Sequence, residues 1–326
     1  MKPEILSEAP QIISEFLGYL QTIRGKSPKT IDEYYLDLRT FFRFMKRYRN
    51  IVPKNTPFED IKINDINIDF IRSITLTDVY SYLNYVMTER GNNAKTRSRK
   101  SSSLRMFFMY LTNKTGQLAQ NPIQELENPK LKKSLPKFLT LEQSMELLAC
   151  TYGDYKERDY CILTLFLNCG MRLSELVGIN LNDIRADSTL RLTGKGNKER
   201  IVYLNDACIR SIEEYKKVRP TDGVIDKNAL FISKFNKRIS PKTVQYIVKK
   251  YLKCIGLDGQ GYSVHKLRHT AATLMYQYGD VDIRILKDIL GHSNLSTTEI
   301  YTHLSSQQLQ NAASANPLSK FNLNKK

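Results

Sequence analysis

The chain has 326 residues, of which 41% are hydrophobic, so it is long enough for about two globular domains and too apolar for wholesale disorder. It carries 50 lysines and arginines against 33 aspartates and glutamates, and the formal net charge of +17 favours a nucleic-acid partner, although ribosome-associated and membrane-surface proteins share this balance. There is no apolar run of the length, about 18 residues, that a membrane span requires, and the start, Met1-Lys2-Pro3-Glu4, lacks the apolar stretch of a secretory signal peptide.

The five cysteines are odd in number and show no C-x-x-C spacing. This pattern predicts reduced thiols in a cytoplasmic protein, and neither a disulfide framework nor a zinc site. The cysteines are Cys150, Cys161, Cys169, Cys208 and Cys254. Two of them, Cys161 and Cys169, lie in an apolar segment and are predicted to be core residues.

The first part of the chain is predicted to be helical. Apolar side chains recur at helical spacing over residues 12–20 and again over residues 31–45, and Ser27-Pro28 has the form of an N-cap followed by a proline in the first turn. Residues 50–75 contain two prolines and many asparagines and aspartates, so we expect a long connection with room for a short strand or helix. Thr77 is expected to cap a third helix.

A fourth helix, which begins near residue 95, has two halves of different character. Its first half is rich in cations and small hydroxyls, and its second half, residues 104–111, is mainly apolar and aromatic. We expect the first half to lie against a DNA backbone while the second packs inside; the alternative is a solvated basic helix end. The predicted DNA-binding side chains are Lys95, Arg97, Arg99 and Lys100.

Residues 116–137 have little apolar periodicity and contain several prolines and the basic run Lys130-Leu131-Lys132-Lys133. They predict a basic linker between a first domain, residues 1–115, and a second domain that begins near residue 138. The second domain opens with Thr140-Leu141-Glu142-Gln143, which has the pattern of a capping box.

The period of the apolar residues then changes from helical to alternating. Residues 189–193 and 200–204 are predicted to form two strands joined by the turn Gly194-Lys195-Gly196-Asn197, and residues 229–232 are a candidate for another short strand. After Ser240-Pro241, which again has the form of a helix cap, the pattern is mostly helical. The predicted fold class is therefore mainly α with a small antiparallel sheet (α+β).

Two arginines far apart in the sequence suit the stabilisation of a phosphoryl group during transfer. Arg172 lies in Gly170-Met171-Arg172-Leu173-Ser174-Glu175-Leu176, and Arg268 lies in His265-Lys266-Leu267-Arg268-His269. A guanidinium group makes bidentate hydrogen bonds and does not deprotonate, so we assign both arginines to the non-bridging oxygens of a phosphodiester. Either one alone would be interpreted as an ordinary surface arginine.

A lysine, two histidines and a tyrosine complete the candidate site. Lys195 is predicted to be the general acid for a leaving 5′ oxygen, although its glycine-flanked turn is also simply a good hairpin turn. His265 shares a helix face with Arg268 and is predicted to shuttle a proton or orient the nucleophile, and His292 is predicted to donate to a phosphate oxygen. Tyr301 is the predicted nucleophile, because a phosphotyrosyl ester conserves the energy of the broken bond and permits religation without ATP.

The pair His265 and His269 also has the spacing of two zinc ligands on one helix. The acidic residue of the H-E-x-x-H pattern is missing between them, and Arg268 would repel a metal ion. We therefore expect a site with no metal and no cofactor.

Together, these motifs resemble those of the tyrosine recombinases, the phage-integrase superfamily, and most of all the Xer-type site-specific recombinases. The resemblance covers nearly the whole chain, and it implies that Glu175 supports the first arginine. It also implies a helical core-binding domain, residues 1–115, and a catalytic domain, residues 138–305, that clamp a DNA duplex. The catalytic positions of the family are matched by Arg172, Lys195, His265, Arg268, His292 and Tyr301. A C-terminal tail, residues 306–326, is expected to contact a neighbouring subunit; its candidate anchors are Leu309, Leu318 and Phe321.

The resemblance also implies an activity. Tyr301 would form a 3′-phosphotyrosyl link, and strand exchange would pass through a Holliday junction within a tetramer on two double-stranded DNA sites, built from identical subunits or with a second recombinase. The expected role is chromosome or plasmid dimer resolution in the cytoplasm, with a DNA translocase as a further candidate partner. The chain begins directly with the core-binding domain, which favours a simple recombination site. Because residues 50–75 look longer than the corresponding connection in compact Xer-type proteins, a mobile-element or phage integrase, or a DNA invertase, is the alternative.

Three other classes of protein compete with this interpretation. A type IB topoisomerase would share the chemistry but act on one duplex. A catalytically inactive DNA-binding regulator would have no need of Tyr301 or Lys195. A metal-dependent nuclease would need a carboxylate cluster for magnesium, which the catalytic segments do not offer.

Overall fold

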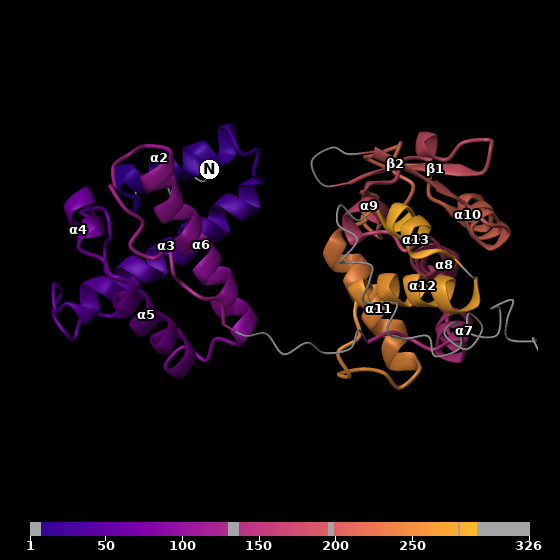
Figure 1. Ribbon diagram of the computed structural model, residues 1–326. Coiled ribbons are helices and arrows are strands. Elements are labelled where there is room, and N and C mark those ends of the chain that lie inside the picture. The colour runs from indigo at the N-terminus through magenta and orange to yellow at the C-terminus, as the bar shows by residue number, and fades with distance from the viewer. Residues whose placement is uncertain (1–7, 130–136, 195–198, 280, 292–326) are drawn as a thin grey trace, which may run out of the picture. The chain divides into compact units, whose positions relative to one another are not determined.

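The described part of the chain is largely helical and contains a two-stranded sheet. The computed structural model describes residues 8–129, 137–194, 199–279 and 281–291 (Figure 1). The chain divides into two units, residues 1–133 and 134–326, each with its own hydrophobic core. Within the described ranges, no helix is both long and apolar enough to cross a membrane. The expected fold class, mainly α with a small antiparallel sheet, is confirmed.

The apolar faces predicted for the first helices form the core of the N-terminal unit. Its described helices are α2 (Gln11–Thr22), α3 (Pro28–Tyr48), η1 (Phe58–Asp60), α4 (Ile68–Arg72), α5 (Leu76–Thr88) and α6 (Ala94–Asn113). Phe16 of α2 and Phe42 of α3 make ring contacts with Phe107 of α6, at centroid distances of 5.3 and 6.0 Å. These contacts join α2 and α3 to α6.

The helix caps of this unit are partly as expected. The Ser27 cap is confirmed, since its hydroxyl accepts a hydrogen bond from the Thr30 N–H. The expected cap at Thr77 is wrong. Thr75 caps α5 instead, because its hydroxyl accepts from the Asp78 N–H while the Asp78 carboxylate accepts from the Thr75 N–H.

Two segments expected to be connections contribute to the N-terminal core. In residues 50–75, Ile63, Ile66 and Ile71 are buried, and the segment carries η1 and α4. After α6, the buried side chains of Leu118, Ile123 and Leu126 join the same core. The N-terminal unit therefore continues past residue 115, where we expected the linker to begin, because these apolar side chains are removed from water there.

The C-terminal unit is built around α8, on which α10 and α12 pack (Figure 1). Its described elements are α7 (Leu141–Ala149), α8 (Lys156–Cys169), α9 (Leu173–Gly178), η2 (Leu181–Asp183), β1 (Thr189–Thr193), β2 (Glu199–Tyr203), α10 (Asp206–Val218), α11 (Pro241–Cys254), α12 (Val264–Tyr278) and α13 (Ile283–Leu290). The capping box at Thr140 and Gln143 and the cap at Ser240 are confirmed. Strands β1 and β2 are antiparallel, with Thr189 opposite Tyr203 and Thr193 opposite Glu199.

The candidate strand at residues 229–232 is wrong. Only isolated bridges occur there, from Asn180 to Ala229 and from Ile232 to Arg238. The Arg219 side chain donates to the carbonyls of Ala229 and Leu230, so these acceptors are satisfied without a neighbouring strand.

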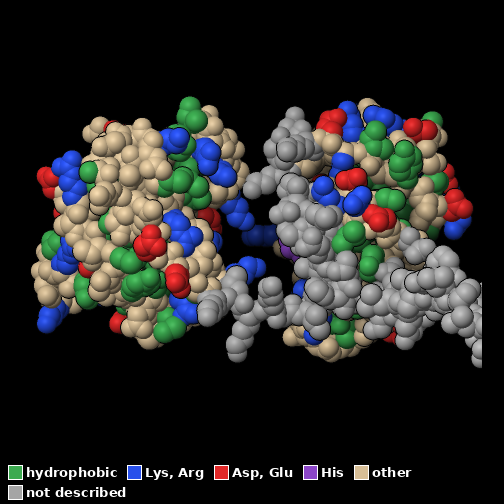
Figure 2. All heavy atoms as spheres, in the orientation of Figure 1, with side chains coloured by type: hydrophobic (Ala, Val, Ile, Leu, Met, Phe, Trp, Pro, Cys, Tyr) green, Lys and Arg blue, Asp and Glu red, His purple; other side chains and the backbone are tan. Residues whose placement is uncertain are grey.

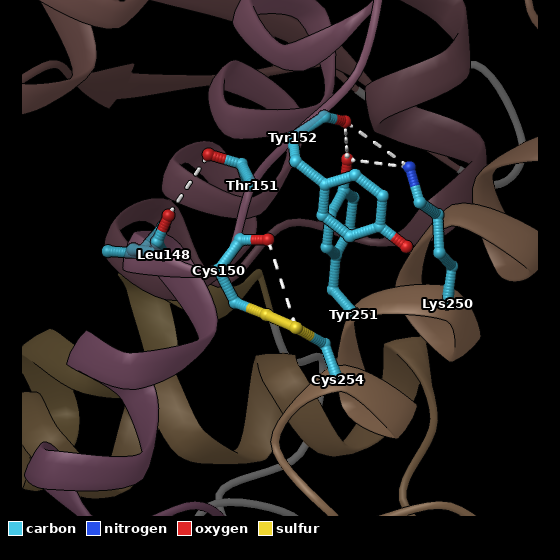
Figure 3. Close-up of a disulfide and its surroundings, with 7 residues drawn as sticks. All are labelled: Leu148, Cys150, Thr151, Tyr152, Lys250, Tyr251 and Cys254. Carbon is cyan, nitrogen blue, oxygen red and sulfur yellow. Dashed lines mark hydrogen bonds between the residues drawn. A yellow bond between two sulfur atoms is a disulfide. The ribbon is translucent and has the colours of Figure 1, made fainter.

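A disulfide joins Cys150, which follows α7, to Cys254 at the end of α11 (Figure 3). The expectation of five reduced thiols is therefore wrong for this pair, whose sequence separation of 104 residues leaves no local spacing to detect. The Cα atoms are 6.6 Å apart, within the usual range for a bridge. Beside it, the Tyr251 hydroxyl donates to the Tyr152 carbonyl at 3.1 Å. The other three cysteines are free and buried.

Candidate active site

Three arginines converge on the C-terminal end of α13. Arg172 precedes α9, Arg200 lies on β2, and Arg268 lies on α12. Each donates to a different backbone carbonyl: Arg200 Nη1 to Ile289, Arg268 Nη2 to Leu290 at 2.5 Å, and Arg172 Nη2 to Gly291 at 2.9 Å. The last carbonyls of a helix have no partner within the helix and carry partial negative charge, so this end of α13 is a natural acceptor for cations.

Glu175 lies among the same three arginines and is 2% exposed. Its carboxylate accepts from the Arg172 backbone N–H and from Arg172 Nη1, both at 2.7 Å, and from Arg200 Nη2 at 2.8 Å. Arg268 Nη1 is 4.0 Å away. Burial acts to raise the pKa of Glu175, but the hydrogen bond and charge of Arg200, together with the contacts of Arg172, hold that pKa below its ordinary value. Three guanidinium groups and one carboxylate leave two net positive charges, enough to attract a phosphodiester.

Two glycines allow the backbone to approach the arginines closely. Gly170 ends α8 at φ +57° and its carbonyl accepts from Arg268 Nη1 at 2.8 Å. Gly291 ends α13 at φ +63°, and a Cβ there would lie 2.9 Å from Cδ of Arg200. A Cβ at Gly170 would lie 2.9 Å from Cδ2 of Leu290. Both positions combine a left-handed backbone with a close neighbour, so both require glycine.

The three arginines differ in their access to a ligand. The side chain of Arg172 is 34% exposed, that of Arg200 is 14% exposed and that of Arg268 is 7% exposed. Arg172 is thus the most open cation of the cluster. The structure brings Arg172, Arg268 and Glu175 together, as a shared phosphate site requires, and it adds Arg200, which we predicted only as a strand residue.

His265 is exposed in the first turn of α12. It lines a hollow of about 500 Å³ together with Leu173, the residue after Arg172. His269, four residues later, is partly buried, and desolvation followed by the charges of Lys266 and Arg268 lowers its pKa from 6.5 to about 4. Among the described residues, no group of three or more histidine, cysteine, aspartate and glutamate side chains is placed to hold a metal ion.

The other three predicted catalytic residues, Lys195, His292 and Tyr301, lie outside the described residues, as does the predicted tail, residues 306–326. Two described residues close to them in the sequence belong to the site. Arg200 of β2 lies five positions after Lys195, and Gly291 directly precedes His292.

The predicted DNA face on α6 is partly an internal network. Asp37 of α3 is 1% exposed and accepts from Arg99 Nη1 at 2.7 Å, from Lys100 Nζ at 3.0 Å and from the Ser103 hydroxyl at 2.7 Å. Lys100 is 8% exposed, so its charge is used to neutralise a buried carboxylate and we withdraw it from the predicted DNA contacts. Lys95 and Arg99 are exposed and Arg97 is partly buried. In Figure 2, Lys and Arg side chains are spread over the visible surface of both units.

Comparison with known proteins identifies the class to which this site belongs. The profile of the phage integrase family matches residues 137–308. The tyrosine recombinase XerC of Caldanaerobacter subterraneus subsp. tengcongensis is 56% identical over 311 residues, which cover 95% of this chain and 88% of that protein. The chain belongs to the phage integrase family, and it is a tyrosine recombinase, a DNA strand transferase, as its motifs predicted.

Solved structures confirm the fold. The XerH site-specific recombinase bound to its difH substrate has a TM-score of 0.67 at 22% identity, over 93% of this chain and 84% of that one. A λ integrase tetramer bound to a Holliday junction has a TM-score of 0.61 at 18% identity, over 87% of this chain and 76% of that one.

Proposed function

We propose that this chain is a site-specific recombinase that resolves chromosome or plasmid dimers in the cytoplasm, cutting and rejoining DNA through a 3′-phosphotyrosyl intermediate. The observation that carries the proposal is the cluster in which Glu175 and the end of α13 hold Arg172 beside Arg268. Such a preassembled pair of arginines suits the charge that develops on a phosphodiester. The 56% identity to a XerC supports the role.

In the proposed first step, Arg172 and Arg268 bind the non-bridging oxygens of the scissile phosphate. The Tyr301 oxygen attacks phosphorus, a new tyrosyl O–P bond forms, and the P–O5′ bond breaks. The phenolic proton passes to a base, for which His265 is the candidate, and the leaving 5′ oxygen takes a proton from Lys195. His292 donates to a phosphate oxygen. No redox partner or nucleotide is needed, because one phosphodiester is exchanged for another.

In the proposed second step, the 5′-hydroxyl of a partner duplex attacks the tyrosyl ester and releases Tyr301. Two such rounds exchange both strand pairs through a Holliday junction, so four subunits act on two DNA sites. We propose a homotetramer, or a heterotetramer with a second recombinase, with a DNA translocase as a further partner. The N-terminal unit would bind the core of the site through Lys95, Arg97 and Arg99 of α6.

Covalent trapping tests this function. The purified protein and its Tyr301→Phe variant are incubated with fragmented host DNA in EDTA, denatured, and assayed for protein that retains DNA. We expect adducts from the wild type alone, and sequencing the trapped DNA identifies the target. Sites at a replication terminus or on a plasmid would support dimer resolution, whereas mobile-element ends or invertible segments would replace it with integration or inversion. Specific DNA binding without adducts would contradict the enzyme and favour an inactive DNA-binding regulator.

A further inference from the structure

Arg200 joins three parts of the candidate active site. It is the second residue of β2 and lies five positions after Lys195. Its Nη2 donates to Glu175 at 2.8 Å, and its Nη1 donates to the carbonyl of Ile289 at the end of α13. One guanidinium group therefore connects the strand, the carboxylate that holds Arg172, and the helix end that accepts from all three arginines.

Arg200 is held by protein partners, as Arg268 is, and it differs from Arg268 in joining β2 to the cluster. Its side chain is only 14% exposed, and both terminal nitrogens already donate within the protein. Its Nε is buried and has no hydrogen-bond partner among the described residues. Arg172, in contrast, is 34% exposed at the same cluster. The geometry gives Arg200 protein partners, and Arg172 the more open position.

The surroundings of Arg200 are built for close contact. Gly291 adopts φ +63°, and a Cβ at this position would lie 2.9 Å from Cδ and 3.2 Å from Nε of Arg200. The end of α13 therefore packs directly on the Arg200 side chain. Because the same end accepts from Arg172 and Arg268, a displacement of Arg200 would move the acceptors of both.

We propose that Arg200 is a positioning residue for strand cleavage: it fixes Glu175 and the end of α13, and so holds Arg172 and Arg268 in the geometry that binds the two non-bridging oxygens of the phosphate. This inference rests on the proposed function. Without Arg200, Glu175 keeps the bonds from Arg172 and the longer 4.0 Å contact with Arg268, but the Ile289 carbonyl loses the Arg200 Nη1 donor. Glu175 and α13 would then be free to shift relative to each other.

The test uses single-turnover cleavage by the full chain on nicked duplexes that carry the site recovered from trapped adducts. Arg200→Met removes the guanidinium but keeps an unbranched side chain that extends to about the position of Nε, and Arg200→Lys keeps the charge. Arg191→Ala is the matched control. Arg191 lies on the paired strand β1, and its ion pairs with Asp183 and, at 3.8 Å, with Glu199 involve no residue of the cluster. Thermal unfolding and DNA affinity are measured for each variant.

We expect Arg200→Met to form the covalent adduct about 10²-fold more slowly than the wild type, as misplacement of catalytic groups by about 1 Å does, with DNA affinity nearly unchanged. Arg200→Lys should recover part of the rate, since an ammonium can reach one acceptor but not both. Arg191→Ala should cleave like the wild type. A variant that unfolds is identified by its thermal transition, and the lysine variant then carries the comparison.

Two modified phosphates separate positioning of the arginines from other roles. A methylphosphonate at the scissile position removes one negative oxygen and so reduces the need for both arginines. The methylphosphonate should therefore reduce the difference in adduct-formation rate between Arg200→Met and the wild type. A bridging 5′-phosphorothiolate supplies a leaving group that needs no proton. With this substrate, the rate difference between Arg200→Met and the wild type should stay the same. Rescue by the phosphorothiolate would overturn the proposal, because Arg200 would then act through Lys195, the proposed general acid.

Other outcomes are also decisive. An adduct rate for Arg200→Met equal to that of the wild type would overturn the inference while the proposed function stood. A loss of DNA affinity that accounts for the whole defect would show that Arg200 contacts DNA directly. A wild type that forms no adduct on any DNA would overturn the proposed function, and the inference with it.

Discussion

Gly291→Ala tests the close packing of α13 against the arginine cluster. The substitution places a Cβ 2.9 Å from Cδ of Arg200, in a residue whose φ is +63°. The left-handed conformation alone costs a non-glycine residue about 1–2 kcal/mol, and relief of the close contact must displace either Arg200 or the end of α13. We therefore expect a loss of about 1–3 kcal/mol in the stability of the C-terminal unit. For a domain of this size, the thermal midpoint falls by about 2–4 °C for each kcal/mol lost.

The assay measures thermal unfolding and covalent adduct formation on the same preparations. Gly178→Ala is the control, because Gly178 is the last residue of α9 and nothing lies within 4 Å of a Cβ built there. The control should be neutral or slightly stabilising. Gly291→Ala should also slow adduct formation by about 10²-fold, since the acceptors of Arg172 and Arg268 move. If Gly291→Ala keeps both the midpoint and the rate of the wild type, the cluster does not depend on this approach, and the reasoning about α13 is refuted.

Four further predictions follow from the same structure. Arg172→Ala should lower the rate of adduct formation by at least about 10²-fold while DNA affinity falls modestly, and equal adduct rates would contradict the clamp. Affinity for duplex DNA should fall by roughly 10³-fold between about 50 and 200 mM salt if phosphate contacts dominate, and a flat response in a filter-binding titration would contradict a basic clamp. His269 has a pKa lowered from 6.5 to about 4 in the folded chain, so the unfolded chain binds its proton first; the stability that this histidine contributes is complete above pH 6.5 and is lost as the pH falls toward 4. Unfolding midpoints should therefore decline from pH 7 to pH 5, and His269→Gln should flatten that decline. A variant whose midpoint falls as steeply with pH as that of the wild type would contradict this role of His269. Cys150→Ser should lower the stability of the oxidised protein by about 2–4 kcal/mol and have little effect under reductant, and equal effects in both conditions would argue against the bridge between α7 and α11.

The sequence predicts most of the helices because their determinants are local. Ser27, Thr140 and Ser240 each cap a helix through a residue three positions ahead, and the apolar faces repeat within a few turns. The errors arise where the hydrogen-bond partner of a residue is distant in the sequence. Lys100 faces Asp37, which lies 63 residues earlier, and the carbonyl of Ile232 accepts from Arg158, which lies 74 residues earlier.

In the candidate site, too, the contacts between residues close in the sequence are predictable and those between distant residues are not. The family resemblance connects Glu175 to Arg172, and the contact is local, because a carboxylate three residues after a helix cap reaches back to its N–H. The contact between Arg200 and Glu175 spans 25 residues, and the three arginines meet carbonyls 22, 89 and 119 residues away. Backbone carbonyls have no residue identity, so no pattern of side chains in the sequence can point to them. A helix end that serves as the shared acceptor explains why Arg200 looks like an ordinary strand residue in the sequence. It also places the requirement for precise geometry on Gly291, a residue with no side chain.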